Sequence, residues 1–306
     1  MTVGPAPREL ARRVEDDLRS VYRRVHRVRL VGVAAELAFF GAISVVPLLL
    51  STIAVVGVLG EHTLLEVQAA IRRAATLTFA GDARKGVLQS LDTLFESRPT
   101  LLSISLLILL VVASRGFLGA IRALSTMYGT DGTRPWWHDR LAALTFTLAG
   151  VALSAFALVA FVVGPALGVL LGTADAAGVG VIARGAWAVT RYVVLAAGVA
   201  AFFSALYRYA RGGHGSWTRD VPGAVVATAL LFVFGTGYRV YLQASPGLGL
   251  GDSEVGRLVG AVLGGTLATL VLLALAGAAL LIGGAFNAER DPDAAATEDL
   301  QGPIAV

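Results

Sequence analysis

Six long apolar stretches fill most of this chain and limit what it can fold into. A helix needs roughly 20 apolar residues to cross the hydrocarbon core of a bilayer, which is about 30 Å thick. Each stretch meets or approaches that length, and each is apolar all round, whereas a soluble amphipathic helix is apolar along one stripe. The stretches are Leu30–Gly60, Thr100–Leu124, Leu141–Leu171, Gly185–Tyr207, Val221–Tyr241 and Leu258–Phe286. We therefore predict an all-α, polytopic membrane protein with six transmembrane helices.

The composition narrows the possible chemistry. Only 15% of the 306 residues are charged, against about 25% in soluble domains. The absence of cysteine excludes disulfides and thiolate chemistry. The four histidines are scattered, without the spacing of a metal site, and no Walker-type phosphate loop is present. We expect no metal, no cofactor, no use of ATP and no enzymatic activity.

Residues 1–29 predict a basic arm on the membrane surface. The arm carries eight arginines and lacks the apolar region of a signal peptide, so the first span should act as an uncleaved anchor. Its apolar residues recur at helical spacing opposite the arginines, which is the pattern of an interfacial amphipathic helix that contacts anionic headgroups. The alternative is a solvated helix. The apolar positions are Leu10, Val14, Leu18, Val21, Val25 and Val28.

Basic residues between the spans predict the orientation. Most arginines fall in the N-terminal arm, around Ser125–Arg140 and around Arg208–Asp220, so we expect these segments and both termini to be cytoplasmic. The longest segment on the other side, residues 61–99, predicts an extracytoplasmic helical hairpin with a turn at Gly81-Asp82. Residues 30–289 would form the membrane domain, and residues 290–306 a disordered acidic tail.

Several strings resemble the YihY/BrkB family of bacterial inner-membrane proteins. They run in order along nearly the whole chain, from the first span to the last. The strings are Ala34-Ala35-Glu36-Leu37-Ala38-Phe39-Phe40, Ser44-Val45-Val46-Pro47-Leu48, Ala113-Ser114-Arg115-Gly116, Leu206-Tyr207-Arg208-Tyr209, Val221-Pro222-Gly223-Ala224 and Gly283-Gly284-Ala285-Phe286-Asn287-Ala288-Glu289.

The resemblance implies a six-span plasma-membrane protein linked to virulence and stress, often called a transporter and formerly labelled a tRNA-processing ribonuclease, ribonuclease BN. Two positions depart from the family pattern. Ala285 stands where the family has an acid, and the proline expected soon after Tyr209 is missing. A role proposed for that acid cannot apply to this chain.

Ionisable residues inside the spans are candidates for function because each costs at least about 2.5–3.5 kcal/mol to insert. Glu36 in the first span and Arg115 in the second lie at similar distances from the cytoplasmic edge, so we predict that they pair inside the bundle. Arg122 lies on the same helical face as Arg115 and would extend the cluster. The pair could line a path for substrate or protons, or it could only hold the helices in register.

Three further positions complete the predicted pathway. Ser44 and Ser51 share a face of the first span with Glu36, and Pro47 between them predicts a kink. Asn287 closes the last span and could cap it or hydrogen-bond a neighbouring helix.

Three functions stay open at this point. The first is movement of a small solute, lipid or ion without ATP; the second is a non-transporting, envelope-organising role; the third, least favoured, is the ribonuclease activity. Expected partners are the bilayer and an unknown small solute, with no specific nucleic acid; a homo-oligomer is possible.

Overall fold

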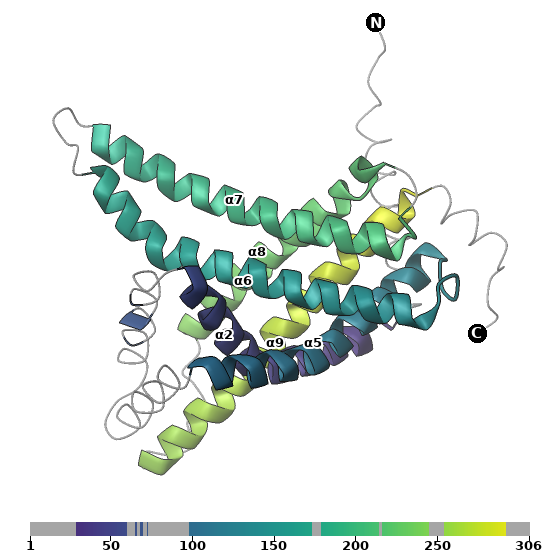
Figure 1. Ribbon diagram of the computed structural model, residues 1–306, viewed down its shortest axis with the longest axis horizontal. Helices are drawn as coiled ribbons and strands as arrows, with labels where there is room; N and C mark the ends of the chain where they lie inside the picture. Colours follow the sequence, from purple (N-terminus) through teal and green to yellow (C-terminus); the bar gives the residue numbers. More distant parts are fainter. Residues whose placement is uncertain are drawn as a thin grey trace, which may run out of the picture. The chain divides into compact units, whose positions relative to one another are not determined.

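The computed structural model describes residues 29–59, 65, 68–69, 72, 98–172, 179–213, 216–244 and 254–291 (Figure 1). Outside these ranges lie residues 1–28 of the predicted arm (1–29), most of the hairpin predicted at residues 61–99, and residues 292–306 of the predicted tail (290–306). What the sequence predicts for those segments therefore stays a prediction.

The described residues form long helices, and no strand is found among them. The elements are α2 (Leu30–Leu59), α5 (Arg98–Tyr128), α6 (Trp136–Gly172), α7 (Val179–Ala210), the 3-10 turn η1 (Trp217–Arg219), α8 (Val221–Ala244) and α9 (Glu254–Glu289). Five helices are long and apolar enough to cross a membrane, and α2 makes a sixth if its two bent parts count as one span. This confirms the all-α membrane fold predicted from the apolar stretches.

Helix α2 bends at the proline that predicts a kink. The axes of Leu30–Val45 and Pro47–Ile53 differ by 49°. Pro47 has no backbone N–H to donate, and its ring clashes with the carbonyl one turn earlier, so the helix cannot continue straight through it.

The chain divides into two compact units. The first unit comprises residues 1–42, 115–143 and 200–306, and the second comprises residues 43–114 and 144–199. Helices α2, α5, α6 and α7 each contribute one part to each unit, whereas α8 and α9 belong wholly to the first.

Small residues bring helix backbones together in the first unit. Helix α8 packs along α9, and a Cβ added at Gly223 of α8 would overlap the carbonyl oxygen of Gly283 in α9. Helix α9 also packs against α2, because a Cβ at Gly277 would lie 3.5 Å from the Cα of Ala34. Such close approach is how helices associate in lipid, where no hydrophobic effect drives them together.

In the second unit, α6 and α7 also pack closely at a glycine. A Cβ added at Gly198 would lie 3.2 Å from Cδ1 of Leu153. Val151, Ala155 and Leu195 are buried in this unit. The polar side chains that follow belong mainly to the first unit.

Candidate ligand pocket at the start of helix α8

A pocket lined mainly by polar and charged residues lies in the first unit, where residues from the ends of α5, α7 and α9 surround the start of α8. Its volume is about 220 Å³, which is smaller than the pockets of about 300–1,000 Å³ that hold drug-sized ligands. The lining residues are Tyr128, Arg211, Arg219, Asp220, Pro222, Asn287, Arg290 and Asp291. The pocket therefore suits a small solute or a single headgroup.

A buried charged triad forms one wall of the pocket. Arg211 follows directly after α7, and its Nη2 donates to Oδ2 of Asp220 at 2.9 Å. Its Nη1 lies 3.7 Å from Oδ2 of Asp291, just beyond α9. All three side chains are buried. The triad links the ends of α7 and α9 to the start of α8, and removing one of its members would leave a buried charge uncompensated.

Asn287 of α9 caps the first turn of α8. The backbone N–H of Gly223 donates to Oδ1 of Asn287 at 2.6 Å, and Nδ2 of Asn287 donates to the carbonyl of Asp220 at 2.8 Å. The first N–H groups of a helix have no partner within the helix. Asp220 immediately precedes α8, but its carboxylate binds Arg211, and Asn287 supplies the capping oxygen. The expected hydrogen bond from Asn287 to a neighbouring helix is thus present.

Two residues of the pocket carry buried polar atoms that lack a hydrogen-bond partner in the described part of the chain. These atoms are the hydroxyl of Tyr128 and Nε of Arg211. Tyr128 is only 3% exposed, and its hydroxyl lies near Asn287 without hydrogen-bonding geometry. Buried polar atoms in proteins nearly always bond to protein, water or ligand. Both residues line the pocket, and a water or ligand that reached either atom after a small side-chain movement would satisfy it.

The rim of the pocket is positively charged. Arg219 in η1 and Arg290 after α9 are exposed, and neither forms an ion pair with a described carboxylate. The guanidinium of Arg290 lies instead 4.1 Å from the centre of the Phe286 ring. Three arginines thus face two aspartates, and both aspartates already bind Arg211.

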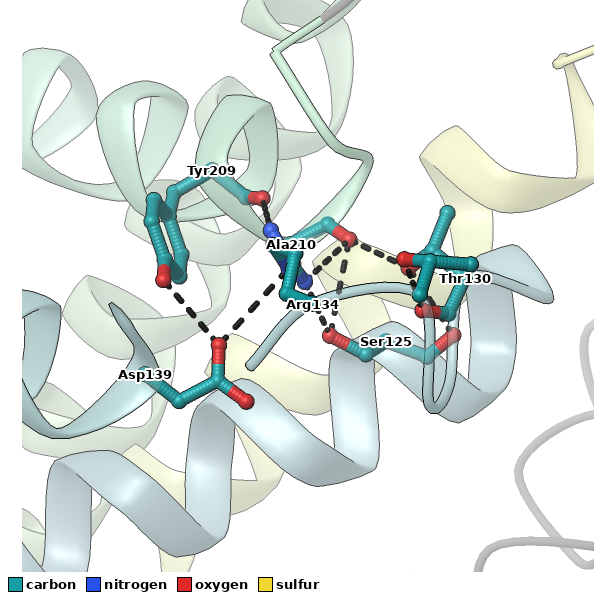
Figure 2. A network of polar contacts seen from close by, with 7 residues as sticks. Ser125, Thr130, Arg134, Asp139, Tyr209 and Ala210 are labelled. Atoms are coloured by element: carbon teal, nitrogen blue, oxygen red, sulfur yellow. Dashed lines mark hydrogen bonds and ion pairs between the residues drawn. The ribbon is translucent and has the colours of Figure 1, made fainter. Parts of the chain in front are cut away.

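A second polar network closes the end of α7 (Figure 2). Arg134, from the segment between α5 and α6, donates through Nη1 to the carbonyl of Tyr209 and through Nη2 to the carbonyl of Ala210 at 3.2 Å. Thr130 Oγ1 donates to the same Ala210 carbonyl at 2.6 Å. The last carbonyls of a helix lack partners within it and carry partial negative charge, so a guanidinium there is favourable.

The same network binds its own side chains together (Figure 2). Arg134 Nη2 also donates to Oγ of Ser125 at 2.8 Å, and its Nε lies 3.6 Å from Oδ1 of Asp139. The hydroxyl of Tyr209 donates to the same Asp139 oxygen at 3.0 Å. These contacts cap α7 and orient the start of α6. The network stabilises the C-terminal end of α7, directly before Arg211. We therefore assign the network a structural role.

The structure does not bring the predicted charged cluster together as a buried pair. Glu36, Arg115 and Arg122 are all exposed, and no ion pair joins Glu36 to Arg115 among the described residues. The Glu36 carboxylate lies beside α5 instead, because a Cβ added at Gly119 would be 3.4 Å from its Oε1. Similar depth in the membrane did not imply that the two side chains point toward each other.

The two predicted serines lie in the second unit. Ser44 and Ser51 are buried, and Oγ of Ser51 has no hydrogen-bond partner within the described ranges. Of the predicted pathway residues, only Asn287 lines the pocket.

Sequence reasoning missed Tyr128, Arg211, Asp220 and Asp291 as site residues. All four lie at or just beyond the ends of apolar stretches, where charges are normally read as topology signals or interface anchors. One available signal was Asp220, an acid directly before the apolar run of α8 and on the same predicted side as Asn287.

The apolar helices and the polar groups at their ends define a multi-pass α-helical membrane protein. The family described as "Virulence factor BrkB" matches residues 21–303, and the chain belongs to that family. This confirms the resemblance seen in the sequence strings.

One relative is a Bacillus subtilis (strain 168) protein named "Putative ribonuclease-like protein YfkH". The two sequences are 26% identical over 257 residues, which cover 83% of this chain and 88% of the relative. No solved structure matches the chain.

Proposed function

We propose that this protein moves a small solute, lipid or ion across the bacterial plasma membrane without ATP, with both termini in the cytoplasm. The observation that carries the proposal is the pocket at the start of α8, where the buried Tyr128 hydroxyl and Arg211 Nε lack partners among the described residues. Unsatisfied polar groups are costly where water is scarce. Their retention at the end of a membrane span favours a site that is filled during function.

The bend in α2 supports the same proposal. Transport proteins commonly contain interrupted spans whose parts rearrange around a bound substrate. Here the bend at Pro47 is accompanied by the buried hydroxyls of Ser51 and Thr52, which have no partner in the described residues. These polar groups are further candidates for contact with whatever is moved.

The alternative is an envelope-organising protein that moves nothing. The observation in its favour is the Arg211–Asp220–Asp291 triad, which ties three helix ends together and would serve a rigid scaffold equally well. The ribonuclease label, motivated by the name of the Bacillus relative, is the third candidate. Incubating the purified protein with precursor tRNA would test it.

Reconstitution into proteoliposomes would distinguish a transporter from an envelope-organising protein that moves nothing. Full-length protein in proteoliposomes would be assayed with three probes: radiolabelled inorganic phosphate, a fluorescent phosphatidylglycerol quenched by dithionite, and a trapped pH dye that reports protons. We expect flux of at least one probe above that of empty liposomes, reduced in Tyr128→Phe and retained in the control Arg140→Gln, whose residue is half-buried and outside the pocket. Absence of flux for all three would favour the scaffold.

A further inference from the structure

We propose that the pocket at the start of α8 binds a phosphate group, either free or as part of a lipid headgroup. This inference rests on the proposed function, because it names the ligand class for the same pocket. It depends on three features that agree: the charge of the rim, the type of hydrogen-bonding atom left unpartnered, and the size of the space.

Charge favours an anion over a cation. Asp220 and Asp291, the two acids of the pocket, are both bound by Arg211. Arg219 and Arg290 add two guanidiniums that pair with no described carboxylate. A bound cation would be repelled by this excess of positive charge, because both carboxylates of the pocket already bind Arg211. The start of α8 adds partial positive charge from its helix dipole.

The unpartnered atoms in the pocket are donors. Arg211 can donate from Nε in addition to the bonds that it already makes, and the Tyr128 hydroxyl can donate while keeping its ring packed. Guanidinium groups bind phosphate oxygens through paired, charge-assisted hydrogen bonds. The exposed guanidiniums of Arg219 and Arg290 could therefore bind the oxygens of one phosphate group directly. A small movement of the lining side chains would bring the buried Tyr128 hydroxyl and Arg211 Nε within reach of the same group.

Two sources could supply that phosphate. A soluble phosphate compound would enter from the aqueous side, and the pocket volume of about 220 Å³ admits only a small one. An anionic phospholipid would enter from the bilayer with its headgroup at the interface, where the neighbouring Trp217 is 49% exposed. The chemistry recognised is the same, so the experiment has one arm for each source.

The first arm measures binding of inorganic phosphate. Full-length protein in a neutral detergent would be titrated calorimetrically at constant ionic strength set with chloride. Arg219→Gln and Tyr128→Phe should each weaken binding roughly tenfold to a hundredfold, as loss of a hydrogen bond to a charged group does. Arg140→Gln, outside the pocket, should bind as the unaltered protein does. Arg219 is exposed and Tyr128→Phe removes a single oxygen, so circular dichroism should show both variants folded.

The second arm replaces free phosphate with lipid. Phosphatidylglycerol in mixed micelles should raise the melting temperature more than diacylglycerol, which lacks the phosphate, and the pocket variants should remove the difference. An effect of free phosphate alone supports a soluble ligand, and an effect of phosphatidylglycerol alone supports a lipid. If neither binds, or if both pocket variants bind like Arg140→Gln, the inference is overturned.

The two proposals can fail separately. Phosphate or lipid binding that depends on Tyr128 and Arg219, in a protein that moves none of the three probes, would leave the anion site standing and remove transport. Flux without any binding of phosphate or phosphatidylglycerol would do the reverse.

Discussion

The close contact between α8 and α9 at Gly223 can be tested by substituting this glycine and measuring the free energy of unfolding. A Cβ added there would lie 2.6 Å from Nδ2 of Asn287 and would overlap the carbonyl oxygen of Gly283. Carbonyl oxygens cannot rotate away as a flexible side chain can, so Gly223→Ala must push the two helices apart. Overpacking of this kind costs about 1–3 kcal/mol.

A second cost arises because the same residue donates the capping hydrogen bond to Asn287. Leaving that buried N–H without an acceptor costs about 1–3 kcal/mol more. Alanine recovers up to about 1 kcal/mol through its higher helix propensity. The net expectation is that Gly223→Ala lowers the free energy of unfolding by about 1–6 kcal/mol.

The matched control lies in the same helix. A Cβ added at Gly235 meets nothing within 4 Å, so Gly235→Ala should leave stability unchanged or raise it slightly. Unfolding of both variants would be followed by circular dichroism in mixed micelles with increasing SDS. Equal stability of the two variants would refute the close α8–α9 contact, and with it the position of Asn287 in the pocket.

Three further predictions follow from the structure and topology. Arg134→Gln should lower unfolding free energy by about 1–3 kcal/mol, because α7 loses hydrogen bonds to its last carbonyls; an unchanged SDS midpoint would contradict the capping role. Glu36→Gln should keep the yield of folded protein, since Glu36 is exposed, whereas Asp220→Asn, in the buried triad, should reduce that yield. Detergent size-exclusion chromatography measures the yield of both variants. A strongly reduced yield of Glu36→Gln would show that the Glu36 carboxylate has a structural partner. The cysteine-free chain allows single-cysteine labelling in spheroplasts: Thr173→Cys should react with an impermeant maleimide, and Thr133→Cys only after permeabilisation, the reverse pattern indicating an inverted protein.

Local physical rules predicted the helices and one hydrogen bond of the site. Transfer of apolar side chains into lipid depends on each segment by itself, so the described residues of all six predicted stretches lie on helices. The bend at Pro47 follows from a missing N–H within one turn. Asn287 was recognisable because an amide at the end of an apolar span needs a partner.

The rest of the site depended on how helices rotate about their axes. Glu36 and Arg115 have similar depth along the sequence of their spans, but rotation leaves both exposed. Arg134 donates to a carbonyl 75 residues away in the sequence, and the hydrophobic periodicity of neither segment predicts that contact.

The sequence by itself determined that this chain enters a membrane and where its spans lie, because lipid solvation is a sum over neighbouring residues. Only the tertiary structure decided which charges meet. Arg211, Asp220 and Asp291 belong to three separate helix ends, and they meet in the same unit where α8 packs closely on α9 at Gly223 and Gly283. The pocket lies where those helix ends meet, and the buried Tyr128 lines it.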